Sequence, residues 1–404
     1  APGGAGQGCS FVDRCALAQD GCRTSRPGLE NLPSGEVVRC FHHENAHQLS
    51  LTGSGAVPAK LDLDAPPALH LHDLAISYRR AGLVDKVLGR DSAGVPTVDG
   101  IEITVAKGET LGLVGESGSG KSTILKAIAG LLPPSGGKIT VVGGNALAPE
   151  AEQRTPDHLR KIQLIFQNPD DSLNPRQTIA QILEQPLKLY FGLMGDALHQ
   201  RSAEILDRVR LGAHYLDRLP SQLSGGEKQR VAIARAFAAE PDLVLCDEVT
   251  SALDVSVQAA VLDLLNDLKA TQGTTYVFVS HDLAVVRALS DRVAVLYQGR
   301  LCELGPSADV YATPSHPYTE VLLGAVLEPD PDTAPTLSAD DVVELSPPAQ
   351  GCPFQRRCPR RIGRICDTDD PPWQQGAKGH AIKCHHSIAD LATAQAEDAA
   401  GQRA

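Results

Sequence analysis

Short apolar segments alternate with longer amphipathic segments through the middle of the chain, between about residues 69 and 327. Near-continuous apolar runs, typical of strands buried on both faces, occur at residues 110–114, 243–246, 276–279 and 293–296. Helical spacing follows the first run, from Lys121 to about Leu131, and another helical run extends from Lys228 to Ala239. The pattern predicts an α/β fold with a mostly parallel sheet, and a helical subdomain at about residues 170–225.

Two small cysteine-containing segments flank this central domain and resemble each other. The early one begins Gly8-Cys9-Ser10-Phe11 and continues to Cys15, Cys22 and Cys40; the late one begins Gly351-Cys352-Pro353-Phe354 and continues to Cys358, Cys366 and Cys384. Their spacings are C-x5-C-x6-C-x17-C and C-x5-C-x7-C-x17-C, so one small module occurs twice.

The domain boundaries follow from composition. Residues 48–68 and 328–347 are rich in Pro and small or acidic residues, which is typical of linkers. We therefore predict a module at 1–47, a central domain at 69–327, and a second module at 348–388. Residues 389–404 are expected to form a tail of frayed helix or disorder.

Overall charge and hydropathy narrow the class of function. The 404 residues carry a net charge of −12, which argues against a broad electrostatic grip on nucleic acid. No run approaches the roughly 18 apolar residues of a membrane-spanning helix, and the first residues lack the features of a signal peptide. Any contact with a membrane is therefore expected through partner proteins. The lack of an initiating Met suggests a piece of a longer protein.

A phosphate-binding motif follows the first apolar run and opens the helix at Lys121. It fits G-x4-G-K-[ST], and its residues are Gly115, Glu116, Ser117, Gly118, Ser119, Gly120, Lys121, Ser122 and the adjoining Thr123. Glycines allow backbone N–H groups to surround phosphates, and the helix dipole adds positive potential. Lys121 is expected to contact the β- and γ-phosphates of ATP, and Ser122 to bind Mg²⁺. The alternative is a structural glycine-rich turn.

Two further segments carry candidate chemistry. Asp247 and Glu248 end an apolar strand, where α/β sheets place ligands, so Asp247 is expected to hold Mg²⁺ and Glu248 to act as general base. Ser224, Gly225 and Gly226 begin another helix and form a second candidate phosphate site. Taken alone, the first segment is more often a solvated strand end and the second an N-cap.

Together, these motifs resemble the ATP-binding-cassette (ABC) family of P-loop NTPases, over about residues 69–327. The resemblance implies an ABC-type nucleotide-binding domain with an antiparallel β part, in which the segment at Ser224 completes the nucleotide site of an opposing cassette. It also assigns roles to Gln167 (Mg²⁺ sensing and contact with the membrane partner), Asp254 (dimer-contact loop), His281 (γ-phosphate contact) and Tyr78 (adenine stacking). For Tyr78 a place in the core is the alternative. Glu227 and Val249 stand where many members have Gln and Pro.

The segment His316-Pro317-Tyr318-Thr319 and the four-cysteine tail resemble the oligopeptide/dipeptide importer branch, which includes nickel importers. The resemblance implies an ATPase at the cytoplasmic face of the membrane, with a second cassette, two permease subunits and, indirectly, a solute-binding protein as partners. In that branch the module follows a cassette, so the early module is expected to be the tail of a first cassette in a fusion; a self-standing metal domain is the alternative. The functional alternatives are a non-transport cassette ATPase and a scaffold without turnover.

The two cysteine sets are candidate metal ligands. Four thiolates suit Zn²⁺ or an iron–sulfur cluster. Structural zinc sites usually include ligands two to four residues apart, whereas five residues separate the closest pair here. The looser spacing favours a larger group, and the resembling branch carries [4Fe-4S] clusters in this tail. Zn²⁺, and a disulfide or metal-free module, are the alternatives.

Overall fold

The structure is a computed structural model that describes residues 8–12, 15, 17–32, 37–48, 66–78, 96–141, 144, 146–251, 253–325, 348 and 350–401. The chain forms two compact units, Ala1–Gly55 and Ala56–Ala404. Most of the first predicted linker (residues 49–65 of 48–68) and all of the second (328–347) lie outside the described residues.

A large mixed sheet forms the centre of the second unit. In the described residues its strand order is β12-β13-β11-β10-β5-β9-β8-β7, and the pairs from β10 to β7 are parallel, which confirms the predicted parallel core. The strands are β5 (Thr110–Val114), β7 (Ile162–Ile165), β8 (Leu243–Asp247), β9 (Thr275–Val279), β10 (Arg292–Tyr297), β11 (Arg300–Pro306), β12 (Trp373–Gln375) and β13 (Ala381–Lys383).

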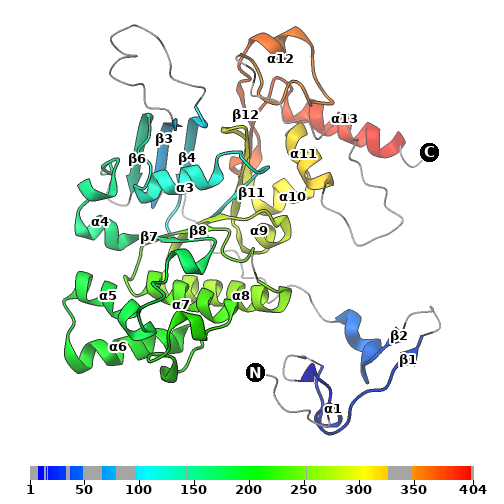
Figure 1. The fold of residues 1–404 in the computed structure, drawn as a ribbon. Helices are drawn as coiled ribbons and strands as arrows, with labels where there is room; N and C mark the ends of the chain where they lie inside the picture. Colours follow the sequence, from blue (N-terminus) through cyan, green and yellow to red (C-terminus); the bar gives the residue numbers. More distant parts are fainter. Residues whose placement is uncertain are drawn as a thin grey trace. The chain divides into compact units, whose positions relative to one another are not determined.

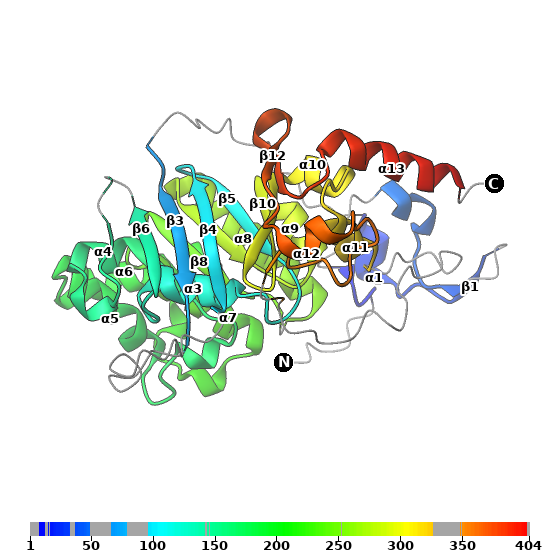
Figure 2. The same cartoon turned by 90° about the horizontal axis from the view of Figure 1, so that it is seen from above.

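A second, antiparallel sheet covers one face of the large sheet. It has the order β4-β3-β6, and its strands run side by side in Figure 2. Their bounds are Leu69–Ile76 (β3), Val98–Val105 (β4) and Gly136–Val141 (β6). Alternate residues of β8 point to the two faces of the sheet. Leu243 and Leu245 pack with the antiparallel sheet and the helix α3 (Lys121–Ala129), whereas Val244 and Cys246 pack with the helices on the opposite face. The near-continuous apolar runs follow from this double burial.

Helices cover both faces of the sheet (Figure 1). Those of the central domain are α3 (Lys121–Ala129), α4 (Pro156–Lys161), α5 (Ile179–Phe191), α6 (Gly195–Arg208), α7 (Gly225–Phe237), α8 (Val255–Gln272), α9 (Leu283–Leu289), α10 (Ser307–Ala312) and α11 (Pro317–Gly324). The helical subdomain is confirmed as α5 and α6. Helix α3 ends two residues before the predicted Leu131 because Gly130 adopts a left-handed C-cap, and α7 begins three residues before Lys228 because Ser224 caps it.

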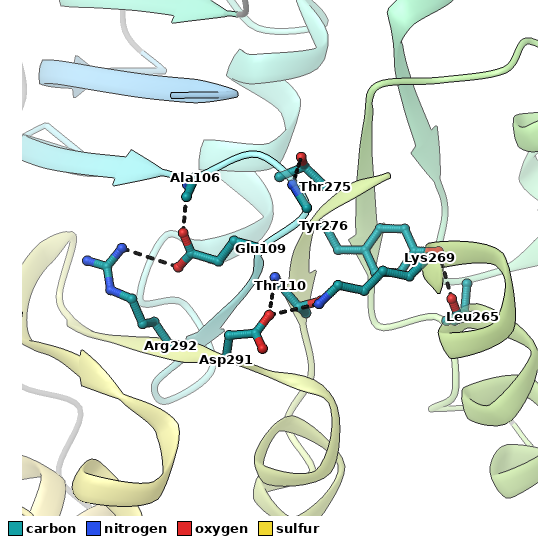
Figure 3. A network of polar contacts seen from close by, with 10 residues as sticks. Ala106, Glu109, Thr110, Leu265, Lys269, Thr275, Tyr276, Asp291 and Arg292 are labelled. Atoms are coloured by element: carbon teal, nitrogen blue, oxygen red, sulfur yellow. Dashed lines mark hydrogen bonds and ion pairs between the residues drawn. The ribbon is translucent and has the colours of Figure 1, made fainter. Parts of the chain in front are cut away.

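A polar network joins the amino ends of three parallel strands to the antiparallel sheet and to α8 (Figure 3). The buried Glu109 carboxylate accepts the Ala106 N–H at 2.6 Å and pairs with Arg292 at 3.2 Å. Lys269 of α8 donates to Asp291 at 2.7 Å and to Thr110 Oγ1 at 2.8 Å. Each buried charge therefore has a partner of opposite sign, as burial requires.

The C-terminal module is attached to the large sheet rather than separate from it. Its hairpin β12–β13 extends the sheet, with Glu303 of β11 opposite Ile382 and Leu304 opposite Ala381. The module also contains α12 (Arg364–Thr368) and α13 (Ile388–Gly401). Of the two possibilities expected for residues 389–404, helix or disorder, the described part is helical: α13 has 14 residues, and its Leu391 is buried against Ile382 and Cys384. Burial of that leucine orders the segment.

The first unit is small and, in its described part, repeats the elements of the C-terminal module. It contains α1 (Asp20–Thr24), a hairpin of β1 (Glu30–Asn31) and β2 (Val37–Val38), and a short 3-10 helix at His43–Gln48. In both modules the third cysteine lies in the short helix and the fourth follows the hairpin. The backbone bond from Cys9 N–H to Cys22 O (2.7 Å) matches that from Cys352 N–H to Cys366 O (2.8 Å). The repeat is therefore structural as well as sequential.

Candidate active site

The phosphate-binding loop lies at the carboxyl end of β5 and leads directly into α3. Gly115 and Gly120 have φ values of +147° and +98°, which glycine adopts without the strain that a side chain would bring. A Cβ on Gly115 would lie 2.1 Å from the Leu296 carbonyl oxygen, so the loop passes close to β10. This turn places the amino end of α3 at the wall of a cleft.

Lys121, the first residue of α3, folds its side chain into the loop. Its Nζ donates to the carbonyl oxygens of Gly115 (2.7 Å) and Glu116 (2.8 Å). Burial lowers the pKa of the Lys121 ammonium, and the negative charges of Glu248 and Asp247 oppose that shift. A partly desolvated cation held by carbonyl oxygens is well placed to bind phosphate oxygens instead.

The two predicted Mg²⁺ ligands lie together. Ser122 Oγ donates to Asp247 Oδ1 at 2.7 Å, although 125 residues separate them in sequence. Burial raises the pKa of the Asp247 carboxyl, the Ser122 hydrogen bond opposes this, and the nearby charge of Glu248 raises it further. A hydroxyl and a carboxylate are hard oxygen ligands, and a cation beside them would favour the ionised carboxylate. The residues present therefore fit Mg²⁺.

Glu248 stands between Gln167 and His281. Its Oε2 accepts the Gln167 side-chain amide at 2.8 Å and lies 3.4 Å from His281 Nδ1. Glu248 has φ of +48°, unusual for a residue with a side chain, and its N–H bonds to the Val279 carbonyl of β9 at 2.9 Å. Such backbone strain persists where surrounding structure enforces it, often at functional sites. It aims this carboxylate at the cleft.

The cleft itself has a volume of about 560 Å³, which suits a nucleotide-sized ligand. The described residues that line it include Tyr78, Thr97, most of the phosphate-binding loop, Glu248 and His281. Tyr78 is 61% exposed, and its hydroxyl lies 3.1 Å from Thr123 Oγ1. The core alternative for Tyr78 is therefore wrong, and its ring is available at the rim of the cleft.

Comparison with known proteins agrees with this geometry. Residues 98–251 match the ABC transporter family, and residues 302–366 match the family described as the oligopeptide/dipeptide transporter C-terminal region. A putative peptide import ATP-binding protein of Brucella ovis is 42% identical over 321 residues, which cover 79% of this chain and 97% of that protein. The chain belongs to the ABC transporter family.

Other relatives extend the comparison. The oligopeptide transport ATP-binding protein OppD of Mycobacterium bovis is 42% identical over 334 residues, which cover 81% of this ABC ATPase and 54% of OppD. Among solved structures, cbiO1 of Clostridium perfringens, part of an ABC transporter complex, superposes with a TM-score of 0.52 at 26% identity, covering 62% of this chain and 92% of that one. An ATP-binding cassette solved as a post-hydrolysis dimer with ADP and phosphate gives 0.50 at 28%, covering 59% and 98%.

The second candidate phosphate site of this ABC ATPase, the segment at Ser224, is not part of the lining described for its own cleft. Ser224 caps α7 through a reciprocal capping box, in which Glu227 accepts the Ser224 N–H at 2.7 Å and its hydroxyl at 2.8 Å. Tyr215 donates to the other oxygen of Glu227 at 2.5 Å. Glu227 therefore orders the segment. Ser224, Gly225, Gly226 and Asp254 are not among the described residues that line the cleft, and their roles at a partner's site stay predictions.

The cysteines of the C-terminal module converge from separate segments. Three of them accept hydrogen bonds from the backbone of the residue two positions later: Cys352 from Phe354, Cys358 from Arg360 and Cys384 from His386. Burial, reinforced by the neighbouring cysteines and opposed by these hydrogen bonds, raises the pKa of Cys352 to about 11 and that of Cys358 to about 12. Ionisation of several of these thiols at neutral pH would therefore need a nearby positive charge.

The spacing of these sulfur atoms bears on which group they fit. Among the described residues, no three cysteine sulfurs of either module lie within 4.8 Å of one another. Four thiolates around one Zn²⁺, with Zn–S bonds of about 2.3 Å, would lie roughly 3.8 Å apart. The sulfur atoms of the described cysteines are therefore not arranged as four ligands of one tetrahedral Zn²⁺ are.

Two contacts of the ATP site were not foreseen from sequence. The Tyr318 hydroxyl accepts the backbone N–H of Glu116 at 2.9 Å, and Arg357 of the C-terminal module pairs with the Glu116 side chain at 2.9 Å. The sequence contained a signal, because Tyr318 lies in the His-Pro-Tyr-Thr segment that resembles the importer branch. Only the fold shows that these residues reach the phosphate-binding loop.

Proposed function

We propose that this chain is the ATP-hydrolysing subunit of an importer that takes up oligopeptides or dipeptides, with nickel as the alternative cargo. The names of its relatives and the match of its tail to the oligopeptide/dipeptide transporter family support the cargo class. The observation that carries the catalytic assignment is the meeting of Ser122, Asp247, Glu248, Gln167 and His281 at the carboxyl ends of neighbouring parallel strands.

In this proposal Glu248 is the general base. Its carboxylate lies in the wall of the cleft beside the phosphate-binding loop, where it can accept the proton of an attacking water. Gln167 and His281 both contact the same carboxylate oxygen of Glu248, Oε2, which leaves the other oxygen for the attacking water. His281 also offers a ring nitrogen for a hydrogen bond to the γ-phosphate.

Binding of MgATP would use the loop and its neighbours. Ser122, Asp247 and Gln167 would hold Mg²⁺, which supplies charge neutralisation at the phosphates. Lys121 and the backbone N–H groups of residues 115–123 would cradle the phosphate oxygens, and the exposed ring of Tyr78 would stack on adenine. The helix dipole of α3 favours the same negative charge.

A second cassette, in the same chain or a paralogue, would complete the site. Ser224, Gly225 and Gly226 at the start of α7 would bind the ATP held by that partner, with Asp254 in the contact loop. The Gln167 segment would transmit closure to two permease subunits, and a solute-binding protein would deliver cargo. We place the protein peripherally at the cytoplasmic face of the membrane, without a nucleic-acid partner. Among the described residues, none of the helices meets the length and apolarity required to cross a bilayer.

The test is Glu248→Gln in the transporter assembled with its permeases. We expect ATP binding to persist and hydrolysis to fall by about a hundredfold or more, because the proton acceptor is lost. Glu204→Gln is the matched control, since Glu204 is an exposed carboxylate of α6 paired with Arg201. Near-normal hydrolysis in Glu248→Gln would overturn the assignment of Glu248 as general base. If the unsubstituted transporter hydrolyses ATP but takes up no peptide or nickel, the ATPase function would stand and the proposed cargo would not.

We further propose that each cysteine module binds one metal centre, a [4Fe-4S] cluster in preference to Zn²⁺. Cys352, Cys358, Cys366 and Cys384 would hold one centre; Cys9, Cys15, Cys22 and Cys40 would hold the other. Support comes from the backbone N–H···S bonds, which recur in the first module from His42 to Cys40 at 3.4 Å. It also comes from the cysteine sulfurs, since no three of those described lie within the 4.8 Å of one another that a single Zn²⁺ would require. The group would stabilise modules too small for a large core.

Anaerobic purification with iron, sulfide and zinc analysis tests this proposal. We expect visible absorbance and about four irons per module. Cys352→Ser should remove one module's iron and leave the other's, whereas Cys246→Ser, at a buried cysteine of β8, should remove none. Colourless protein with stoichiometric zinc would favour the Zn²⁺ alternative.

A further inference from the structure

The C-terminal module contacts the phosphate-binding loop directly. Arg357, three residues after Phe354 in the module, forms an ion pair with Glu116, the second residue of the loop. The Arg357 guanidinium lies 2.9 Å from the Glu116 carboxylate, and only 14% of the arginine side chain is exposed. On the same residue, the Glu116 backbone N–H donates to the Tyr318 hydroxyl at 2.9 Å. Glu116 is therefore bound at its side chain by Arg357 and at its backbone by Tyr318.

An aromatic cluster lies beneath these two contacts. Phe354 is 1% exposed and packs 5.2 Å from Tyr297 and 5.3 Å from Tyr318, measured between ring centroids. Arg357 lies over the rings of Tyr297 and Phe354 at 5.8 and 5.9 Å. Phe354 thus fixes both the tyrosine that holds the loop backbone and the arginine that holds the loop side chain.

We infer that the C-terminal module positions the phosphate-binding loop, so that nucleotide affinity and the integrity of the module are coupled. Arg357 and Tyr318 are the positioning residues. The loop is rich in glycine and would otherwise sample many conformations, so restraining Glu116 reduces the entropy lost when phosphates bind. Coupling between two sites is reciprocal, and bound nucleotide must therefore stabilise the module by the same factor.

The affinity experiment uses the full chain as purified, in a Glu248→Gln background that prevents turnover. The affinity for MgATP is measured by titration with a fluorescent ATP analogue and competition by ATP. We expect Arg357→Gln to weaken binding by roughly fivefold or more, with a smaller loss for Tyr318→Phe. Arg361→Gln is the matched control: it removes the same charge from the same module, but Arg361 pairs with Asp367 inside the module.

A second measurement separates positioning from a general loss of structure. MgATP should slow the reaction of the module's cysteines with a thiol reagent in the unmodified and Arg361→Gln proteins, but not in Arg357→Gln. The inference would be overturned if Arg357→Gln and Arg361→Gln bound MgATP equally well. It would also be overturned if MgATP did not change the rate of cysteine modification in the protein without these substitutions. The inference rests on the cleft being the ATP site; failure of the unmodified protein to bind ATP would count against the proposed function itself.

A different observation concerns the first module. Phe11 occupies the place of Phe354 in the repeated Gly-Cys-x-Phe segment, and Arg14 occupies the place of Arg357. Phe354 is 1% exposed because cassette aromatics cover it, whereas Phe11 is 54% exposed. Strand β13 pairs with β11 of the cassette, whereas β2, its counterpart, pairs among the described strands only with β1. Among the described residues of the first unit, Phe11 and β2 therefore lack the partners that bury Phe354 and that pair with β13.

We propose that the first module docks through Phe11 and β2 on a second ABC cassette, beside that cassette's phosphate-binding loop. The pocket of this chain's own cassette already holds Phe354, so it offers no room for Phe11. The occupant must present a strand edge like β11 and paired tyrosines like Tyr297 and Tyr318.

Photocrosslinking in native cells tests this docking on the intact protein. Benzoylphenylalanine in place of Phe11 should crosslink to a peptide of a second cassette next to its own G-x4-G-K-[ST] loop or His-Pro-Tyr segment, whether on the same polypeptide or another. The same probe in place of Thr24, an exposed residue of α1, is the control and should give no such product. Crosslinks to residues 69–327 of this chain, to a protein without a cassette, or to nothing would overturn the proposal.

Discussion

Lys269→Met probes the polar network at the amino ends of the parallel strands. Lys269 Nζ lies 2.7 Å from Asp291 and 2.8 Å from Thr110 Oγ1, and Asp291 also accepts the Thr110 N–H at 2.8 Å. Methionine keeps most of the aliphatic stem and its packing on α8 but removes the charge. The carboxylate of Asp291 would then remain partly buried with no cation donating to it among these contacts.

The magnitude follows from burial. Removing one partner of a fully buried ion pair costs about 3–5 kcal/mol, whereas an exposed pair contributes about 0–1 kcal/mol. The side chains of Lys269 and Asp291 are 17% and 13% exposed, which places this pair between the two limits. We therefore expect the free energy of unfolding to fall by about 2 kcal/mol, which lowers the melting temperature by roughly 5 °C for a domain of this size.

Lys188→Met is the matched control for this prediction. Lys188 pairs with Glu184 at 2.8 Å, but on the surface of α5, where the lysine side chain is 55% exposed. The same substitution there should cost only about 0.3–0.5 kcal/mol. Urea unfolding followed by circular dichroism compares the two variants. A cost for Lys269→Met within about 0.5 kcal/mol of the control would refute the argument from burial.

The location of the network predicts its functional effect. Thr110, Thr275 and Arg292 begin their strands, whereas the phosphate-binding loop and Asp247 lie at the opposite, carboxyl ends. Lys269→Met should therefore leave the affinity of the folded protein for MgATP unchanged. A large loss of affinity at a temperature where the variant is folded would show that the network acts on the ATP site.

Three further predictions concern the ATP site and the buried His316. Gly115→Ala should abolish measurable nucleotide binding in titrations, because a Cβ would lie 2.1 Å from the Leu296 carbonyl oxygen. Asp247→Asn should raise the Mg²⁺ concentration for half-maximal ATPase activity by about tenfold or more, since one anionic ligand is lost; an unchanged Mg²⁺ requirement would contradict its role. Burial lowers the pKa of His316, the N-cap of α11, to about 4. The unfolded chain therefore binds this proton at a higher pH than the folded protein does, and the free energy of unfolding should fall by about 3 kcal/mol as pH falls from 6.5 to 4. His316→Asn, which retains a helix-capping acceptor, should flatten that loss, measured by urea unfolding followed through Trp373; an identical pH slope would contradict it.

The sequence by itself determined the fold class and most of the ATP site. Apolar runs mark strands buried on both faces, and a glycine-rich loop before a helix marks a phosphate site, because each depends on local backbone geometry and on the period of the pattern. The duplicated cysteine module was also predictable, since the spacing of the cysteines is a property of the sequence. Family membership followed from the same motifs.

Only the tertiary structure decided which distant residues meet. Ser122 and Asp247 are 125 residues apart, and Glu116 and Arg357 are 241 apart, yet each pair is in hydrogen-bond contact. Sheet order sets such meetings, and strand order is not encoded in local periodicity. The helical structure of α13 likewise depends on tertiary contacts. Leu391 is buried against Ile382 of β13, a strand that extends the cassette's sheet, so a segment whose sequence only weakly indicates a helix becomes one. Burial against distant residues supplied the free energy that local propensity lacked.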